Sequence, residues 1–170
     1  MTAIRRLHSL SDAQIDALAE VLIDCVAGGA SVSFMHPLTA DKARAFWRRI
    51  AAALPTGERA LLVAEDGSDI VGTVQLLLDQ PENQPHRADL SKMLVHRRAR
   101  RQGLGAALMR AAETAARDEG KTLLVLDAVT GGDAERLYAG LGWMRVGVIP
   151  DYALWPDGRP CDTTVFYKSL

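Results

Sequence analysis

Hydrophobic residues recur along the chain with two different periods, and the change of period separates helices from strands. Near the start, Ser11 can cap a helix whose apolar residues lie three and four positions apart, and the glycines at 28–29 are expected to end it. A second run with helical spacing begins after Thr39 and ends before Pro55. The sequence therefore predicts a short strand at residues 3–7 followed by two helices.

From residue 59 onward the pattern is typical of strands. Residues 59–66 and 69–78 are rich in strand-forming side chains and are separated by a Gly-Ser pair, which predicts a hairpin. The nearly all-apolar run 121–129 is typical of a strand covered on both faces. The other expected elements are a strand at 88–96, a helix opening at the glycines near 103, a short helix over 133–140, and strands near 143–149 and 163–168. This order predicts an α/β fold with a mixed, largely antiparallel sheet of six to seven strands flanked by about four helices.

Composition indicates one ordinary globular unit. The 170 residues are 48% hydrophobic and 24% charged, without an internal repeat or a linker, so we expect a single domain over residues 1–170. A net charge of −1 gives no general attraction to nucleic acid or to an anionic membrane. Cys25 and Cys161 lie far apart and no metal-ligand spacing is present, which predicts free, reduced thiols and no metal site. No apolar run reaches the ~18 residues of a membrane span. Together with the net charge, this predicts a cytoplasmic protein without a membrane or nucleic-acid partner.

A glycine-rich bend between a strand and a helix is the clearest chemical signal in the chain. The segment LSKMLVHRRARRQGLG (90–105) leads into Gly103 and Gly105, where free backbone N–H groups would lie at the positive end of a helix dipole. Four neighbouring arginines add positive charge: Arg97, Arg98, Arg100 and Arg101. The pattern predicts a phosphate site. The alternative is a solvated basic loop whose glycines serve only the turn.

Two other phosphate-binding loops fit this bend less well. A P-loop requires Lys and a hydroxyl residue directly after its last glycine, and neither follows Gly105. A dinucleotide fingerprint would need a third glycine where Leu108 stands, and it should follow its strand at once, whereas HRRAR intervenes.

These residues resemble the signature of the GNAT superfamily of N-acetyltransferases, an apolar strand followed by R/Q-x-x-G-x-G/A and a helix. Arg100, Gly103 and Gly105 match it in order. A second family signature, A-x-x-x-Y-x-x-x-G-[FW], is matched by Ala134, Tyr138, Gly142 and Trp143. The resemblance implies a GNAT fold splayed between the fourth and fifth strands, with acetyl-CoA as cosubstrate. The residues that it implies in coenzyme A binding are Met93, Leu94, Val95, Arg100, Arg101, Gln102, Gly103, Leu104, Gly105 and Ala106.

Closer similarity is to the tabtoxin resistance acetyltransferases and extends over nearly the whole chain. It is carried by GGASVSFM (28–35), RADLSKMLV (87–95) and PDYALWPDG (150–158). It implies a small, amino-acid-like amine acceptor, with an antimicrobial or toxin among the candidates. The first segment supplies residues expected to shape the acceptor pocket, the alternative being packing onto the core: Ser31, Ser33, Phe34 and Met35.

Acetyl transfer requires a base for the amine and an acid for the leaving thiolate. Asp89 in the central strand and Asp127 at the end of an apolar run are both candidate bases, and the sequence does not distinguish them. Ordinary strand or strand-end carboxylates are the alternative. Tyr138 occupies the family's tyrosine position, which implies the general acid, although helical spacing alone would favour packing against the sheet. A backbone N–H near Leu94 or Val95 is expected to stabilise the oxyanion.

The sequence thus predicts an N-acetyltransferase acting on a small amine. The alternatives are acetylation of a protein N-terminus or lysine, and a non-catalytic module that binds acyl-CoA. The bulky segments 28–37 and 150–160 are expected to close over the slot, which argues against a long peptide groove. A monomer and a homodimer both fit the sequence.

Overall fold

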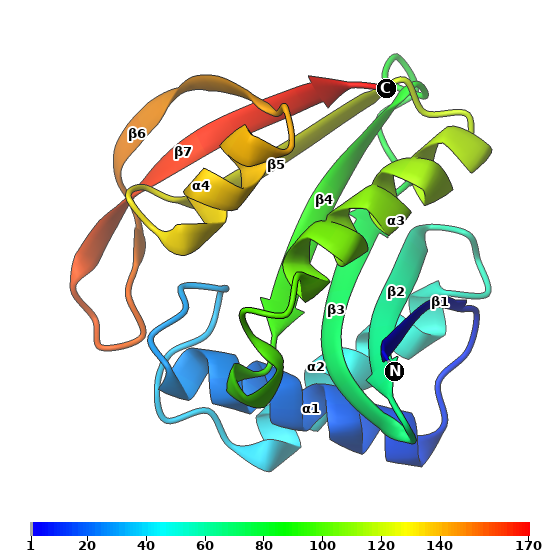
Figure 1. Cartoon of the computed structure of the whole chain (residues 1–170), viewed down its shortest axis with the longest axis vertical. Coiled ribbons are helices and arrows are strands. Elements are labelled where there is room, and N and C mark those ends of the chain that lie inside the picture. The colour runs from blue at the N-terminus through cyan, green and yellow to red at the C-terminus, as the bar shows by residue number, and fades with distance from the viewer. Residues whose placement is uncertain (1) are drawn as a thin grey trace.

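A seven-stranded sheet forms the centre of the computed structural model, which describes residues 2–170 (Figure 1). Its order is β1-β2-β3-β4-β5-β7-β6, and all neighbouring strands are antiparallel except β4 and β5, which are parallel. The strands are β1 (Thr2–Leu7), β2 (Arg59–Asp66), β3 (Asp69–Leu77), β4 (Arg87–Val95), β5 (Leu123–Val129), β6 (Met144–Leu154) and β7 (Pro160–Ser169). The predicted element order and the mixed α/β fold are confirmed.

Four α-helices flank this sheet within the described residues: α1 (Asp12–Ala27), α2 (Ala40–Ala53), α3 (Leu104–Asp118) and α4 (Asp133–Gly140). The predicted capping box begins α1, since the Gln14 N–H donates to the Ser11 hydroxyl at 3.2 Å and the Ser11 N–H donates to the Gln14 side chain at 2.9 Å. Thr39 caps α2 with a single bond, in which its hydroxyl accepts from the Lys42 N–H at 3.3 Å. None of these helices has the length and apolarity needed to cross a membrane.

Two hydrophobic clusters hold the helices on opposite faces of the sheet. Leu61 and Val63 of β2 pack with α1 and α2, whereas the alternating residues Leu62 and Ala64 pack with α3. This alternation follows from the two-residue period of a strand. On the α1–α2 side, the face of β5 and β7 carries exposed residues, so this part of the sheet remains open to ligands.

β5 is not covered on both faces, contrary to the expectation from its apolar sequence. Leu124 and Leu126 are buried, while Val125 is half-buried and Asp127 is exposed. The cause is the divergence of β4 and β5, which pair only through Arg87–Asp89 opposite Leu123–Val125. The strand is apolar because one face lies in the core and the other borders a cleft.

The last two strands are longer than the sequence predicts. β6 continues to Leu154 through an irregularity that includes Asp151, whose φ is +50°. Residues 150–154 therefore belong to a strand, and only residues 155–159 form the loop before β7.

A buried ion pair joins α3 to the C-terminal strands. Lys168 of β7 donates to both carboxylate oxygens of Glu113 at 2.8 and 2.9 Å and to the Leu141 carbonyl at 2.8 Å. The Trp143 indole N–H donates to the same carboxylate at 3.2 Å. Because Glu113 is only 6% exposed, its removal leaves the indole N–H without an acceptor and the ammonium without its counter-ion, with only the Leu141 carbonyl to accept from it.

We expect Glu113→Ala to lower the free energy of unfolding by about 3 kcal/mol, measured by urea denaturation. Asp16→Ala is the matched control, because Asp16 pairs with Arg44 at 2.6 Å on the surface. That variant should lose less than about 1 kcal/mol. Equal losses in the two variants would contradict the role given to the buried pair.

Candidate active site

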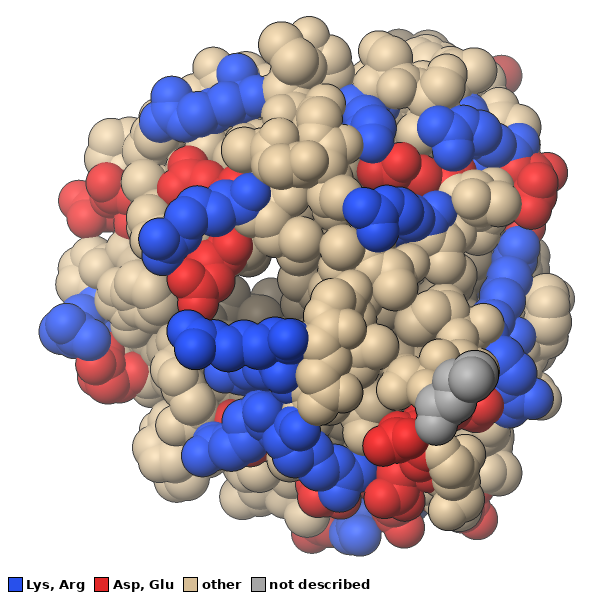
Figure 2. All heavy atoms as spheres, viewed as in Figure 1, with Lys and Arg blue, Asp and Glu red and all other residues tan. Residues whose placement is uncertain are grey.

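The divergence of β4 and β5 opens a cleft through the middle of the sheet, as predicted. Beyond Asp89 and Val125 the two strands no longer pair, and a cavity of about 1070 Å³ lies between them. Its walls come from both strands, residues 28–33, the bend at 99–106 and the start of α4. Figure 2 shows the hollow in this face of the molecule, with basic side chains gathered below it.

The bend at the start of α3 has the conformation that a phosphate site requires. Gly103 precedes the helix with φ +77° and offers no side-chain cap, so no side chain of its own occupies the first-turn N–H groups of α3. A Cβ on Gly103 would meet no atom within 4 Å, which places open space next to these donors. A polyanion fits this concave, positively polarised surface.

The four arginines before the bend have different partners. Arg97 is bound to Asp24 through its Nε and its backbone N–H, and Arg98 pairs with Asp69 at 3.2 Å. Arg100 donates to the Val95 carbonyl at 3.0 Å and lines the cleft. Arg101 also lines the cleft, with φ +61°, and forms no ion pair with any residue in 2–170. The predicted cluster of four charges is therefore reduced to Arg100 and Arg101 as candidates for an anionic ligand.

Most residues expected to bind the cofactor line the cleft, but Gln102 does not, because it lies exposed at the tip of the bend. The role of Gly105 also changes. A Cβ there would come within 3.1 Å of Leu137 Cδ2, so this glycine permits close packing of α4 against the first turn of α3. Both glycines line the cleft, but only Gly103 has open space where a side chain would stand.

Asp127 and Tyr138 reach the same cleft from opposite faces of β5. Tyr138 is 5% exposed and packs against Phe166 and Trp143, with ring centroids 5.9 and 6.1 Å away. Its hydroxyl forms no hydrogen bond within residues 2–170. Burial and, secondarily, the negative charge of Asp127 raise the pKa of Tyr138 above its ordinary value. The hydroxyl therefore keeps its proton at neutral pH and can donate it.

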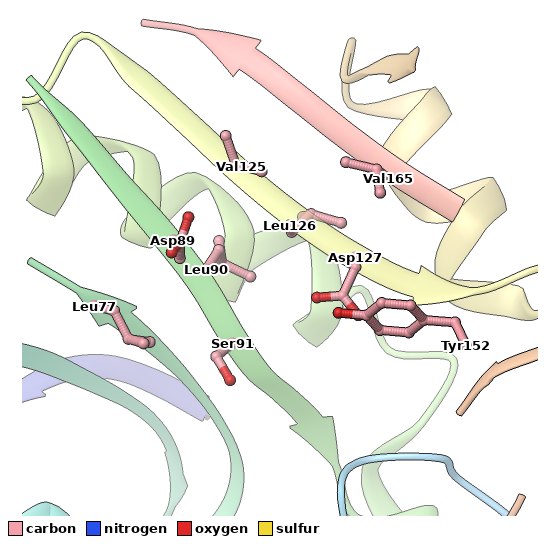
Figure 3. Close-up of a pocket in the computed structure, with 9 residues that line it drawn as sticks. All are labelled: Leu77, Asp89, Leu90, Ser91, Val125, Leu126, Asp127, Tyr152 and Val165. Atoms are coloured by element: carbon pink, nitrogen blue, oxygen red, sulfur yellow. The ribbon is translucent and has the colours of Figure 1, made fainter. Parts of the chain in front are cut away.

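A second cavity, of about 370 Å³, lies on the α1–α2 side of the same opening. Figure 3 shows Asp89 and Asp127 projecting into it from β4 and β5, with Tyr152 reaching toward Asp127. The structure thus brings the two candidate bases to one place. Its remaining walls are apolar, formed by Leu77, Leu90, Val125, Leu126 and Val165, apart from Ser91.

The two carboxylates have different surroundings. Asp89 accepts from Arg87 Nη1 on one oxygen and from Gln80 Nε2 at 3.3 Å on the other. Arg87 is itself fixed by Gln84 at 2.8 Å. Asp127 is exposed in the cleft and has no hydrogen bond or ion pair from any side chain in the described chain. Asp127 can accept a proton without disturbing a contact, whereas protonation of Asp89 would neutralise its ion pair with Arg87.

The segments 28–36 and 154–161 are hydrogen-bonded to each other beside the cleft. The Ser31 hydroxyl donates to the Leu154 carbonyl at 2.8 Å, and the His36 N–H donates to the Pro156 carbonyl at 3.0 Å. Of the four residues predicted to shape the acceptor pocket, Ser31 and Ser33 line the cleft. Phe34 and Met35 do not, because Phe34 packs edge-on against Phe46 at 5.2 Å and Met35 lies exposed beside Gly158.

Lys92 is a cleft residue that sequence reasoning missed. Its Nζ donates to the Ser33 hydroxyl at 3.1 Å and lies 5.9 Å from the centre of the Phe46 ring. A charged residue inside the central strand was the available signal. Its position depends on a β-bulge that the sequence pattern did not indicate.

Comparison with known proteins decides the family. The chain matches the family described as Acetyltransferase (GNAT) family over residues 22–143. The chain belongs to the GNAT acetyltransferase family. Its members take the acetyl group from acetyl-CoA, and the bend around Gly103 fits the phosphates of that donor. Among residues 2–170, no group of three or more His, Cys, Asp or Glu is arranged to hold a metal ion.

Individual relatives are similar over different lengths. N-acetyltransferase 8B of Rattus norvegicus is 36% identical over 95 residues, which are 55% of this chain and 43% of the rat protein. The match thus spans less than half the length of that relative. The solved structure of yncA from Salmonella typhimurium, with its cofactor acetyl-CoA, has a TM-score of 0.81 and 22% identity, and the match covers 100% of this chain and 94% of that one. The ribosomal-protein-alanine N-acetyltransferase of Brucella melitensis has a TM-score of 0.79 and 23% identity over 99% of both chains. At these identities the solved structures establish the GNAT fold alone.

We expect Gly103→Asp in this GNAT protein to weaken acetyl-CoA binding about 10–100-fold in calorimetry, since it puts a carboxylate where N–H groups would hold phosphate. Gly57→Asp is a matched control, because Gly57 has the same φ of +77° and equally open space but lies outside the cleft. Equal affinities in the two variants would remove the bend from the cofactor site.

Proposed function

We propose that this protein transfers the acetyl group of acetyl-CoA to the primary amine of a small, amino-acid-like molecule. The observation that carries the proposal is the placement of Asp127 and Tyr138 in one cleft, on opposite faces of β5, where β4 and β5 separate. Asp127, the proposed base, then faces the side from which the amine approaches, and Tyr138, the proposed acid, faces the side on which the thiolate leaves.

The proposed chemistry is direct attack. Acetyl-CoA supplies an activated acetyl group and a thiolate leaving group. Asp127 accepts a proton from the acceptor ammonium, directly or through water, and so frees the nitrogen lone pair for attack on the carbonyl carbon. As the C–N bond forms and the C–S bond breaks, Tyr138 donates its proton to the sulfur. Its raised pKa supports this role because the proton is present throughout the neutral range.

Asp89 is assigned a positioning role in this proposal. Its contacts with Arg87 and Gln80 fix the wall of the acceptor cavity opposite Asp127. The proposed anchoring of coenzyme A uses the bend residues that line the cleft and the backbone of residues 93–95, which lacks a strand partner on its β5 side.

The small size of the acceptor is supported by the segments beside the cleft. Residues 28–36 and 154–161 are joined by hydrogen bonds, which restricts the space that an extended peptide would need. The resemblance to tabtoxin resistance acetyltransferases points in the same direction, so we include resistance to an amino-acid-like toxin in the proposal. The buried free thiols Cys25 and Cys161 fit a reducing, cytoplasmic location for this single domain.

The test is release of the coenzyme A thiol from acetyl-CoA with a panel of acceptors: L-amino acids, β-lactam toxins, polyamines, aminoglycosides, and peptides with a free N-terminus or a lysine. We expect turnover with one or more amino acids or amino-acid-like toxins. Turnover confined to peptides would replace the proposal with protein acetylation. Tight acetyl-CoA binding without turnover on any amine would favour a non-catalytic module.

A further inference from the structure

Lys92 presents a cation inside the cleft without a counter-ion. Its ammonium has three N–H groups, of which one donates to Ser33. The face of the Phe46 ring lies 5.9 Å away, which favours a positive charge at this point. No carboxylate in residues 2–170 lies within 4 Å of this Nζ. Burial lowers the pKa of Lys92, which is what a cation with too little water and no anion beside it should show.

The backbone is distorted in a way that puts Lys92 on the acceptor side. Thr73 pairs with Leu94 and Gln75 pairs with Ser91, so Lys92 and Met93 together stand opposite a single residue of β3. Lys92 itself has φ +52°, a left-handed conformation that is uncommon for a long side chain. After the bulge, Met93 packs with the α3 cluster, while the Lys92 side chain reaches Ser33 and Phe46 on the α1–α2 side.

The surroundings of Lys92 contain more donors than acceptors. Arg59 is close enough for its charge to contribute to lowering the pKa of Lys92, and it donates to Gln75 Oε1 at 3.1 Å. The buried Gln75 Nε2 has no acceptor in the described part of the chain. Asp89 is already occupied by Arg87. Asp127 is the nearby carboxylate whose charge acts on Lys92, and it is too far away for an ion pair. The cleft therefore holds a cation and an anion that face one space without neutralising each other.

We propose that Lys92 binds the carboxylate of the acceptor, and that the acceptor is a small amino acid in which a free carboxylate stands close to the reacting amine. This rests on the proposed function, since Asp127 is taken to bind the ammonium of the same molecule. The amine at Asp127 and the carboxylate at Lys92 then orient the acceptor across the opening between β4 and β5. The apolar walls formed by Leu77, Val125 and Val165 are left for the side chain.

We assign the anion at Lys92 to the acceptor rather than to the phosphates of coenzyme A, although both regions line one cavity. Lys92 lies against Ser33 and the α2 residue Phe46, whereas the phosphate donors and Arg100–Arg101 lie at the start of α3. Along the chain, Lys92 is separated from Arg100 by the end of β4 and the 3-10 turn at Arg97–Ala99. Affinity for acetyl-CoA should consequently be unchanged when Lys92 is replaced.

The experiment compares L-leucine with L-leucinamide, which differ in the carboxylate while keeping the amine and an apolar side chain. In Lys92→Met we expect KM for L-leucine to rise about 10–100-fold, because the variant loses a hydrogen bond to a charged group. KM for L-leucinamide, which has no carboxylate, should change less than about 3-fold. Lys92→Arg should recover part of the preference for the free acid. Ser33→Ala, which frees the ammonium to move, should raise KM for L-leucine by a smaller factor. Calorimetric binding of both ligands to the complex with coenzyme A gives the same comparison without turnover.

The outcomes separate the two proposals. If the wild-type enzyme acetylates small amines but Lys92→Met changes both KM values equally, the carboxylate assignment is overturned and the proposed function stands. If the wild type neither binds nor acetylates any small amine while peptides react, both are overturned. Unchanged acetyl-CoA affinity and melting temperature in Lys92→Met and Lys92→Gln show that the variants are folded and that the effect belongs to the acceptor.

Discussion

Replacing Asp127 with asparagine is expected to lower kcat about 10²–10⁴-fold, the contribution of a positioned general base, while acetyl-CoA affinity stays unchanged. Asparagine keeps the size of the side chain but cannot take a proton from the ammonium. Because Asp127 is exposed and has no side-chain partner in the described structure, the substitution leaves no other group unsatisfied, so stability should be unaffected. The measurement is the steady-state rate of thiol release at saturating acceptor.

Asp89→Asn is the matched control for this prediction. It makes the same chemical change in the same cavity, but the charge that it removes is paired with Arg87, whereas that of Asp127 is unpaired. We expect less than about a 10-fold loss of kcat, smaller than the effect of removing a general base. A larger loss in Asp89→Asn than in Asp127→Asn would transfer the role of base to Asp89.

Tyr138→Phe is expected to lower kcat about 10²-fold or more, with the dissociation constant of acetyl-CoA nearly unchanged. The phenyl ring keeps its contacts with Phe166 and Trp143, and the lost hydroxyl has no hydrogen-bond partner in residues 2–170. The melting temperature of Tyr138→Phe should therefore be unchanged, which serves as a control within the same variant. Tyr167→Phe removes a hydroxyl from an exposed tyrosine of β7 outside both cavities and should leave kcat unchanged.

The pH profile gives an independent readout for Tyr138. Its pKa is raised from the model-compound value of 10.0, so the hydroxyl stays protonated as pH rises through that value. The rate should increase with pH as the acceptor amine loses its proton and should not fall between about pH 8 and 10 through loss of the acid. A decline in that range that is present in the wild type and absent in Tyr138→Phe would contradict the raised pKa of Tyr138. An unchanged kcat in Tyr138→Phe would contradict its assignment as the acid.

The features that the sequence predicts here are local ones. The capping box at Ser11, the glycine at the start of α3 and the short helix that carries Tyr138 each depend on residues close together in the chain. Their positions in the structure agree with the prediction because capping and turn chemistry are decided by a few neighbours.

The features that were missed depend on contacts between distant segments. The apolar run of β5 indicated a covered strand because apolar content alone does not distinguish a face in the core from a face that borders a cleft. The resemblance to the GNAT family implied that β4 and β5 separate, but not that they stop pairing after Asp89 and Val125. The pairing of Asp89 with Arg87 and Gln80, and the contact between Gly105 and Leu137, likewise appear only when the chain is folded. The bulge at Lys92 reverses the alternation of β4, so a strict two-residue period assigns that side chain to the opposite face.

A single-turnover experiment tests the proposed direct transfer at Asp127 and Tyr138 most directly. The enzyme–acetyl-CoA complex is mixed with the acceptor found in the panel, quenched at intervals in acid, and assayed for N-acetylated acceptor and for the mass of the intact protein. We predict that product appears at the rate of thiol release, that the protein never carries an acetyl group, and that Asp127→Asn slows the step about 10²–10⁴-fold. An acetylated protein that forms and decays as product appears, or a step that Asp127→Asn leaves unchanged, would contradict the account.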